Sequence, residues 1–170
     1  MDDVLFECIY TDSEELLREA FVKVRDKDKV DTGRALILFA VCVLAFAIWR
    51  KLVVSAVLSI ILLCAGIYCL RIPGLKAHNT MANVRRINHG SVPSARIVID
   101  DKITHYYKSN IAVMELEDLR AAFFLKKTII LVGEEGSTIF DRSGFTKGNA
   151  ETFEAFLREK CPQTQIVHRA

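Results

Sequence analysis

The sequence has none of the short motifs that commonly identify a catalytic or cofactor-binding chain. It has no G-x-S-x-G around any serine, no glycine-rich phosphate loop and no Cys-x-x-Cys pair. Its four histidines share no spacing typical of metal ligands. We therefore expect no catalytic residue, no cofactor and no metal site, and we expect that the chain is not an enzyme.

Charged side chains are almost absent from the segment between positions 35 and 70. The residues of this segment outside the apolar set are Arg50, Lys51, Ser55, Ser59 and Gly66. The two cations divide it into apolar stretches at about 35–49 and 52–70. Because a hydrocarbon core about 30 Å thick needs about twenty helical residues, we expect a transmembrane helical hairpin over residues 34–71. The first stretch is short unless residues 32–34 extend it, and a buried core hairpin is the alternative.

The positions of the cations predict the orientation of this hairpin. Within about twenty residues of the apolar stretches, the two outer flanks carry ten Lys and Arg residues, whereas the turn carries two. Cytoplasmic loops are enriched in Lys and Arg. We therefore expect a multi-pass membrane protein with both termini in the cytoplasm.

Small residues recur at helical spacing in the second apolar stretch, at Ser55, Ser59 and Gly66. Such residues let two helices approach closely in lipid. We expect this stripe to pack the two helices of the hairpin together, and a homodimer contact is the alternative. The stretches carry no charged residue inside them that would favour a pore.

A basic segment follows the hairpin. The sequence Ile72-Pro73-Gly74 predicts that the second helix ends there, and residues 72–92 form a juxtamembrane segment. Residues 71–96 contain five cations and no acid, and each cation gains about 1 kcal/mol near an anionic leaflet. The candidate contacts for anionic lipid headgroups are Arg71, Lys76, Arg85, Arg86 and Arg96. The alternative is that these charges only enforce topology, and no nucleic-acid partner is expected.

The polar parts of the chain predict an α+β fold. Residues 1–33 indicate a cytoplasmic strand and helix. Residues 93–170 show twofold periodicity in short segments joined by turns. We expect a hairpin of residues 95–99 and 103–107 around Asp100-Asp101, a further strand at about 111–114, and an antiparallel pair of residues 119–124 and 128–132. A helix begins after Asn149 with Phe153, Phe156 and Leu157 on one face, and Pro162 ends it. We expect a small β-rich cytoplasmic domain closed by this C-terminal α-helix.

Three segments and two aromatic residues carry a resemblance to a known family: Ile97–Ile103, Val113–Leu119 and Ile139–Phe145, which leads into Phe153 and Phe156. On these residues the chain resembles the YcxB-like membrane proteins of bacteria. It implies a bacterial plasma membrane location and a PH-like fold for residues 93–170. It implies no functional residue, because the family brings no established activity.

Three functions remain open from the sequence. The first is a membrane-anchored cytoplasmic binding or regulatory module, whose partners would be the lipid bilayer, anionic headgroups, another protein or a second copy. The second is an accessory subunit of a larger membrane complex, recognised through the hairpin. The third is a lipid-modifying enzyme with an unrecognised site.

Overall fold

The computed structural model describes residues 4–134 and 136–169. The elements in chain order are β1 (Phe6–Thr11), α1 (Glu14–Ala20), the π-helix η1 (Phe21–Arg25), α2 (Lys27–Arg50), α3 (Val53–Ile87), β2 (Ser94–Ile99), β3 (Lys102–Tyr107), β4 (Asn110–Glu115), the 3-10 turn η2 (Leu116–Asp118), β5 (Leu119–Phe124), β6 (Thr128–Gly133), β7 (Ser137–Asp141), β8 (Phe145–Lys147), α4 (Ala150–Lys160) and β9 (Gln165–His168). The chain has an α+β fold with two long apolar helices, as expected.

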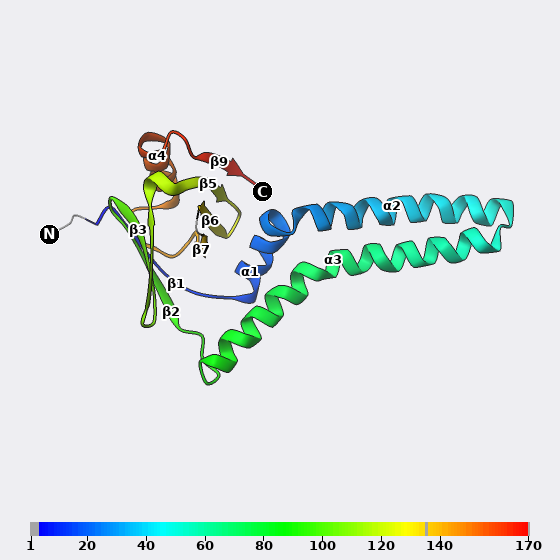
Figure 1. Cartoon of the computed structure of the whole chain (residues 1–170), viewed down its shortest axis with the longest axis horizontal. Helices are drawn as coiled ribbons and strands as arrows, with labels where there is room; N and C mark the ends of the chain where they lie inside the picture. The colour runs from blue at the N-terminus through cyan, green and yellow to red at the C-terminus, as the bar shows by residue number, and fades with distance from the viewer. Residues whose placement is uncertain (1–3, 135, 170) are drawn as a thin grey trace. The chain divides into compact units, whose positions relative to one another are not determined.

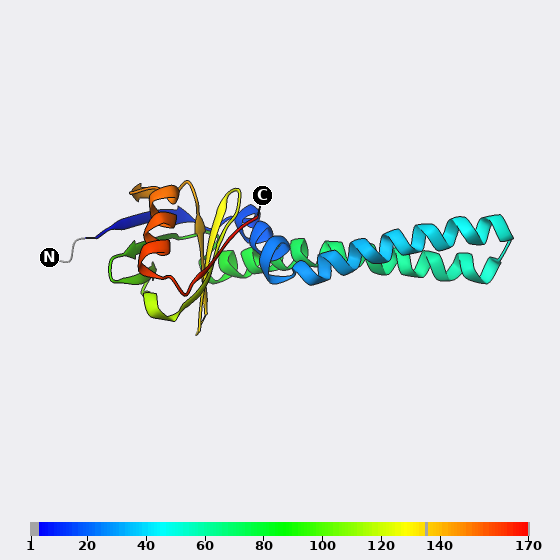
Figure 2. The same cartoon turned by 90° about the horizontal axis from the view of Figure 1, so that it is seen from above.

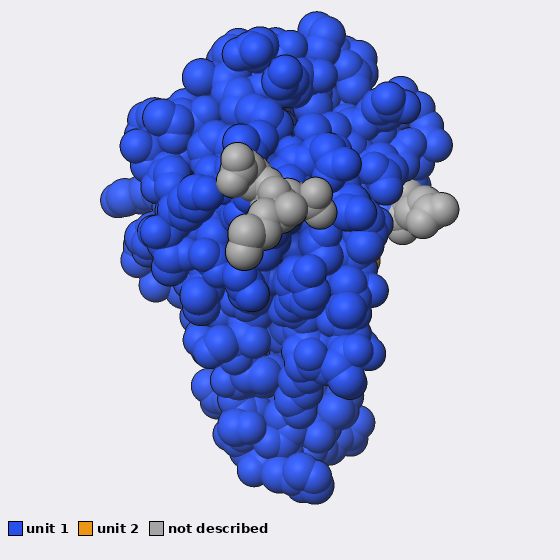
Figure 3. Space-filling model, turned by 90° about the vertical axis from the view of Figure 1, so that its left-hand side faces the viewer, with its two compact units in different colours: residues 1–20, 78–170 blue, residues 21–77 orange. Residues whose placement is uncertain are grey.

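The chain divides into two compact units, which Figure 3 colours separately. The hairpin unit is Phe21–Ala77. The β-rich unit comprises the described residues up to Ala20 and those from His78 onward. The hairpin unit is therefore an insertion in the sequence of the β-rich unit.

This division differs from the boundaries expected from the sequence. We expected residues 1–33 as a separate segment, but β1 pairs antiparallel with β2 on one side and with β8 on the other. Its partners include Ile97 for Cys8 and Ala95 for Tyr10. An interior strand gains hydrogen bonds from both neighbours, so the N-terminal strand belongs to the same fold as residues 93–170.

Two sheets enclose the core of the β-rich unit. One has the order β4-β3-β2-β1-β8 and the other the order β7-β6-β5-β9, in which β9 runs parallel to β5. The predicted hairpins β2–β3 and β5–β6 are confirmed. Figures 1 and 2 show α4 beside these strands.

Helix α4 joins the cores of both sheets through Phe153. This fully buried ring lies 5.4 Å from Phe6 of β1 and 6.2 Å from Phe140 of β7, between ring centroids. Asn149 caps the helix, accepting a hydrogen bond from the N–H of Thr152 at 2.8 Å, as expected. The predicted C-terminal helix is therefore confirmed.

Helices α2 and α3 run side by side in the hairpin unit (Figures 1 and 2). A Cβ atom on Gly66 would lie 2.7 Å from the side chain of Ile37 and 2.9 Å from the backbone oxygen of Gly33. Ser59, on the same stripe, is buried. The expected packing of this stripe between the two helices is confirmed at Gly66.

The turn between the two helices needs no glycine. Lys51 adopts a left-handed conformation with φ 53° and ψ 37°, and Leu52 donates a backbone hydrogen bond to Ala47 at 2.8 Å. A single residue in this conformation commonly ends a helix by satisfying its last carbonyls. The first helix therefore extends to Arg50.

The prediction that the second helix ends at Pro73 is wrong. Helix α3 continues through Pro73 to Ile87. Proline removes one backbone donor and usually breaks a helix, but apolar surroundings and neighbouring helices can compensate for it. Pro73 is fully buried, so its ring packs within the unit.

Candidate functional site

The five cations expected to contact anionic lipid differ in their surroundings. Lys76 donates hydrogen bonds from Nζ to both carboxylate oxygens of Asp26, at 2.6 and 2.9 Å. Lys29 lies 3.2 Å from the same carboxylate. Burial alone would raise the pKa of Asp26, but the hydrogen bonds from Lys76 and Lys29 lower it. The charge of Lys76 is therefore already matched within the hairpin unit.

Arg96 is also paired. Its Nε lies 2.6 Å from Oε1 of Glu7, across the β1–β2 pair. The remaining three cations, Arg71, Arg85 and Arg86, have exposed side chains on α3. Lipid contact through these arginines remains a prediction.

Strand β4 is an open edge of the five-stranded sheet. It pairs only with β3 in the described sheet. In an antiparallel pair, alternate residues direct their N–H and C=O groups away from the partner strand. Ile111 and Val113 of β4 are 62% and 51% exposed, although β-branched apolar residues favour covered surfaces. The strand therefore offers both backbone groups and apolar side chains to a partner.

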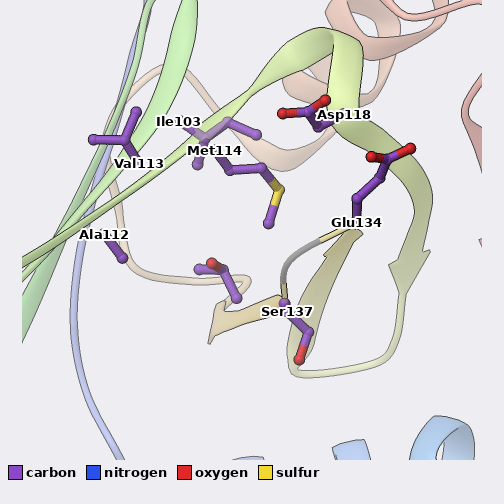
Figure 4. A pocket seen from close by; sticks show the side chains of 9 residues that line it. Ile103, Ala112, Val113, Met114, Asp118, Glu134 and Ser137 are labelled. Carbon is purple, nitrogen blue, oxygen red and sulfur yellow. The ribbon is translucent and has the colours of Figure 1, made fainter.

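A groove of about 340 Å³ lies beside this edge, between β4 and the β6–β7 hairpin. Figure 4 shows the side chain of Met114 projecting between Asp118 and Ser137. Its sulfur and terminal methyl would each lie 3.0 Å from a Cβ atom on Gly133. Because methionine is flexible and polarisable, it can reshape the floor of the groove around different side chains.

The surroundings of the groove are acidic. A second depression, of about 780 Å³, adjoins the C-terminal end of β4 at Glu115. Together the two depressions contain six carboxylates and two lysines. The carboxylates are Asp100, Asp101, Glu115, Glu117, Asp118 and Glu134, and the lysines are Lys102 and Lys160. Glu134 is matched by Arg120 through an ion pair. This excess of negative charge favours a positively charged ligand.

A second polar cluster is partly buried at the inner face of the same sheet. The hydroxyl of Tyr10 lies 3.1 Å from Nε2 of His105. Burial lowers the pKa of His105 and raises that of Asp12. His105 is therefore a half-buried histidine beside Tyr10 in this sheet.

Nucleophilic and metal chemistry gains little support from the described residues. Burial raises the pKa of the Cys8 thiol to about 12, so the thiol is protonated at neutral pH and reacts poorly. In the part of the chain that the structure describes, no three His, Cys, Asp or Glu side chains are grouped as metal ligands. The arrangement is suited to binding a polypeptide by backbone pairing.

Sequence reasoning identified β4 as a strand but not as an edge. The groove needs β4 of one sheet together with Glu134, Gly136 and Ser137 of the β6–β7 hairpin of the other. Its one sequence signal is the acids around positions 115–118 and 134, which are separated in the sequence and come together only in the folded chain. Comparisons with protein families, curated proteins and solved structures find no match to this chain.

Proposed function

We propose that this chain is a membrane-anchored binding module that captures an extended, basic segment of a partner protein along strand β4. Two helices are long and apolar enough to cross a membrane. Their apolar side chains are largely exposed, such as Phe39 at 60% and Val54 at 74%. Contiguous exposed apolar surface is costly in water, so lipid is the fitting environment.

The membrane anchoring in this proposal is carried by one observation, the insertion of both apolar helices between β1 and β2 of one folded unit. A folded sheet cannot be divided by a bilayer, because its strands need direct hydrogen bonds. Both ends of the insertion therefore return to the same side, which requires an even number of crossings. This supports a hairpin with both termini on one side of the membrane, and the ten cations of the flanks favour the cytoplasm as that side.

The chemistry of the partner follows from β4. An extended segment can add to an open sheet edge through main-chain hydrogen bonds, while pockets select its side chains. The acidic depressions beside β4 and at its C-terminal end favour Lys or Arg in that segment. A second copy of this chain fits less well, because it would bring the same carboxylates together.

Membrane topology is tested by single-cysteine labelling in intact bacterial cells. Lys51→Cys and Ser91→Cys are made separately in a variant without native cysteines. These two positions are chosen because both are exposed. An impermeant maleimide should label the first from outside and the second only after permeabilisation. Equal labelling of both in intact cells would contradict the hairpin orientation.

Edge binding is tested by hydrogen exchange on the full chain in nanodiscs. The probes are two synthetic strand-forming peptides with alternating Val and either Lys or Glu. The Lys peptide should slow exchange in residues 110–115, and the Glu peptide should not. Val113→Lys should abolish this protection, since lysine on an edge opposes pairing with a basic strand.

The matched control is Ile9→Lys, on an exposed position of β1, which is an interior strand of the same sheet. This variant should retain protection of β4 by the Lys peptide. Loss of protection in Ile9→Lys would assign binding to the face of the sheet and overturn edge binding. Spontaneous dimers that already protect β4 would instead identify a second copy as the partner.

The YcxB-like and PH-like assignments, the accessory-subunit role and the lipid-modifying role remain predictions. The exposed apolar side chains of α2 and α3 are compatible with contact to another membrane protein. Replacement of residues 27–72 by an unrelated hairpin should preserve peptide binding at β4 if the hairpin is only an anchor. Loss of that binding with correct topology would favour the subunit role.

A further inference from the structure

The turn between β5 and β6 directs two successive backbone N–H groups at one carboxylate. Glu19 of α1 accepts hydrogen bonds from the N–H of Lys126 at 3.1 Å and from the N–H of Lys127 at 3.1 Å. Successive backbone N–H groups that converge in a turn form a concave binding place for anions. The turn is therefore already holding an anion, supplied by the protein itself.

A hydroxyl completes this set of donors. Oγ1 of Thr128 donates to Oε2 of Glu19 at 2.7 Å, and Thr128 is fully buried. Three donors from three consecutive residues thus converge on a single carboxylate. Hydrogen bonds to an ionised acceptor are stronger than those between neutral groups, so this geometry is specific for a negatively charged ligand.

Cations surround the same turn. A cavity of about 430 Å³ adjoins it and is lined by Lys126, Lys127 and Arg142, by Ser13 and Ser143, and by the carboxylates of Glu15 and Asp141. Glu15 pairs with Lys127, and Asp141 accepts a hydrogen bond from the hydroxyl of Ser143. Among the residues that the structure describes, the ammonium group of Lys126 has no ion-pair partner, and its side chain is exposed. The cavity therefore offers the free cation of Lys126 next to the anion-holding turn.

Helix α1 supplies the internal anions from one face. Glu15 and Glu19 are four residues apart, which places both on the same side of a helix. Nζ of Lys127 lies 2.7 Å from Oε1 of Glu15, so the charge of Lys127 is already matched. The carboxylates of Glu15 and Glu19 thus match the Lys127 side chain and the three converging donors of the turn, respectively.

We propose that the β5–β6 turn is a phosphate-binding site that Glu15 and Glu19 of α1 occupy as internal ligands. A phosphate group carries more charge than one carboxylate and offers three acceptor oxygens, so it can satisfy all three converging donors and Lys126 together. Its binding displaces Glu19 and releases α1 from the turn. The phosphate belongs either to a free phosphate compound or to a lipid headgroup, which share this chemistry.

The first test uses the wild-type chain in nanodiscs of phosphatidylcholine. Hydrogen exchange in α1 should become several-fold faster in inorganic phosphate than in chloride at matched ionic strength, because phosphate competes with Glu19. Exchange in β4, which belongs to the other sheet, should remain unchanged. Equal exchange of α1 in both salts would overturn displacement of Glu19 by free phosphate.

The second test is chemical rescue. Glu19→Ala should lower Tm, and inorganic phosphate should restore part of this loss, because the empty turn gains an anion. Glu154→Ala is the matched control, since it removes an acid that pairs with Arg158 and His168 elsewhere in the same unit. Phosphate should not rescue this control.

The two sources of phosphate are separated by the nanodisc composition. Rescue of Glu19→Ala by inorganic phosphate in phosphatidylcholine supports a free phosphate ligand. Rescue only after phosphatidylglycerol is included supports a lipid headgroup, and it should disappear in Glu19→Ala combined with Lys126→Ala. Absence of rescue in both compositions overturns the site. Glu19→Gln replaces Glu19→Ala in the same design if the alanine variant does not fold.

Discussion

Gly33 and Gly66 meet across α2 and α3 so closely that a Cβ atom on Gly33 would lie 2.9 Å from the backbone oxygen of Gly66. Close helix approach of this kind is stabilised by van der Waals packing. Gly66→Leu should therefore force the helices apart and destabilise the hairpin by about 1–3 kcal/mol. Thermal unfolding in mild detergent measures the effect. Ala65→Leu is the matched control, because Ala65 is exposed on the same helix, and an equal loss there would contradict the packing argument.

Asp26 should stabilise the hairpin unit through Lys76 and Lys29. Its side chain is 4% exposed, so Asp26→Asn should cost about 1–3 kcal/mol. Asp31→Asn, which breaks an exposed pair with Arg34, should cost less than about 1 kcal/mol. Denaturant titration of both variants at neutral pH compares them. Similar losses of stability in the two variants would show that burial of Asp26 does not increase its contribution to stability.

The pH dependence of this contribution has a definite sign. The pKa of Asp26 is lower in the folded chain than its ordinary value of 3.8. The unfolded chain then binds the proton first as pH falls, so the stabilisation is present above pH 3.8 and is lost at lower pH. Asp26→Asn should remove this part of the acid sensitivity.

His105 should make the β-rich unit sensitive to weak acid. Burial lowers its pKa from 6.5, so the unfolded chain binds a proton more readily than the folded one. Stability should therefore decrease as pH falls below 6.5. His105→Gln should flatten the dependence of Tm on pH in this range. Parallel curves for wild type and His105→Gln would contradict this assignment.

Phe153 should be among the most costly residues to truncate. It is fully buried and contacts rings from both sheets, so Phe153→Ala should destabilise the β-rich unit by about 3–5 kcal/mol. Ile111→Ala, at a 62% exposed position, should change stability little. Urea unfolding followed by circular dichroism tests both. A small effect of Phe153→Ala would indicate that α4 is dispensable for the core.

Local signals in the sequence were sufficient for most elements. The twofold periodicity around Asp100 and Asp101 predicted the β2–β3 hairpin, and Asn149 predicted the start of α4. These signals depend on a few neighbouring residues, because turns and caps are satisfied locally. They failed at Pro73, where burial among apolar neighbours allows α3 to continue.

The sequence by itself determined the two apolar helices, the interruption at Arg50-Lys51 and the α+β character of the remainder, because composition and periodicity express burial directly. Tertiary structure alone decided that β1 lies between β2 and β8 and that β4 is an open edge beside a groove. It also decided that Glu19 occupies the β5–β6 turn. Strand order and the convergence of donors join residues about a hundred positions apart, and no local pattern records which distant segments pair.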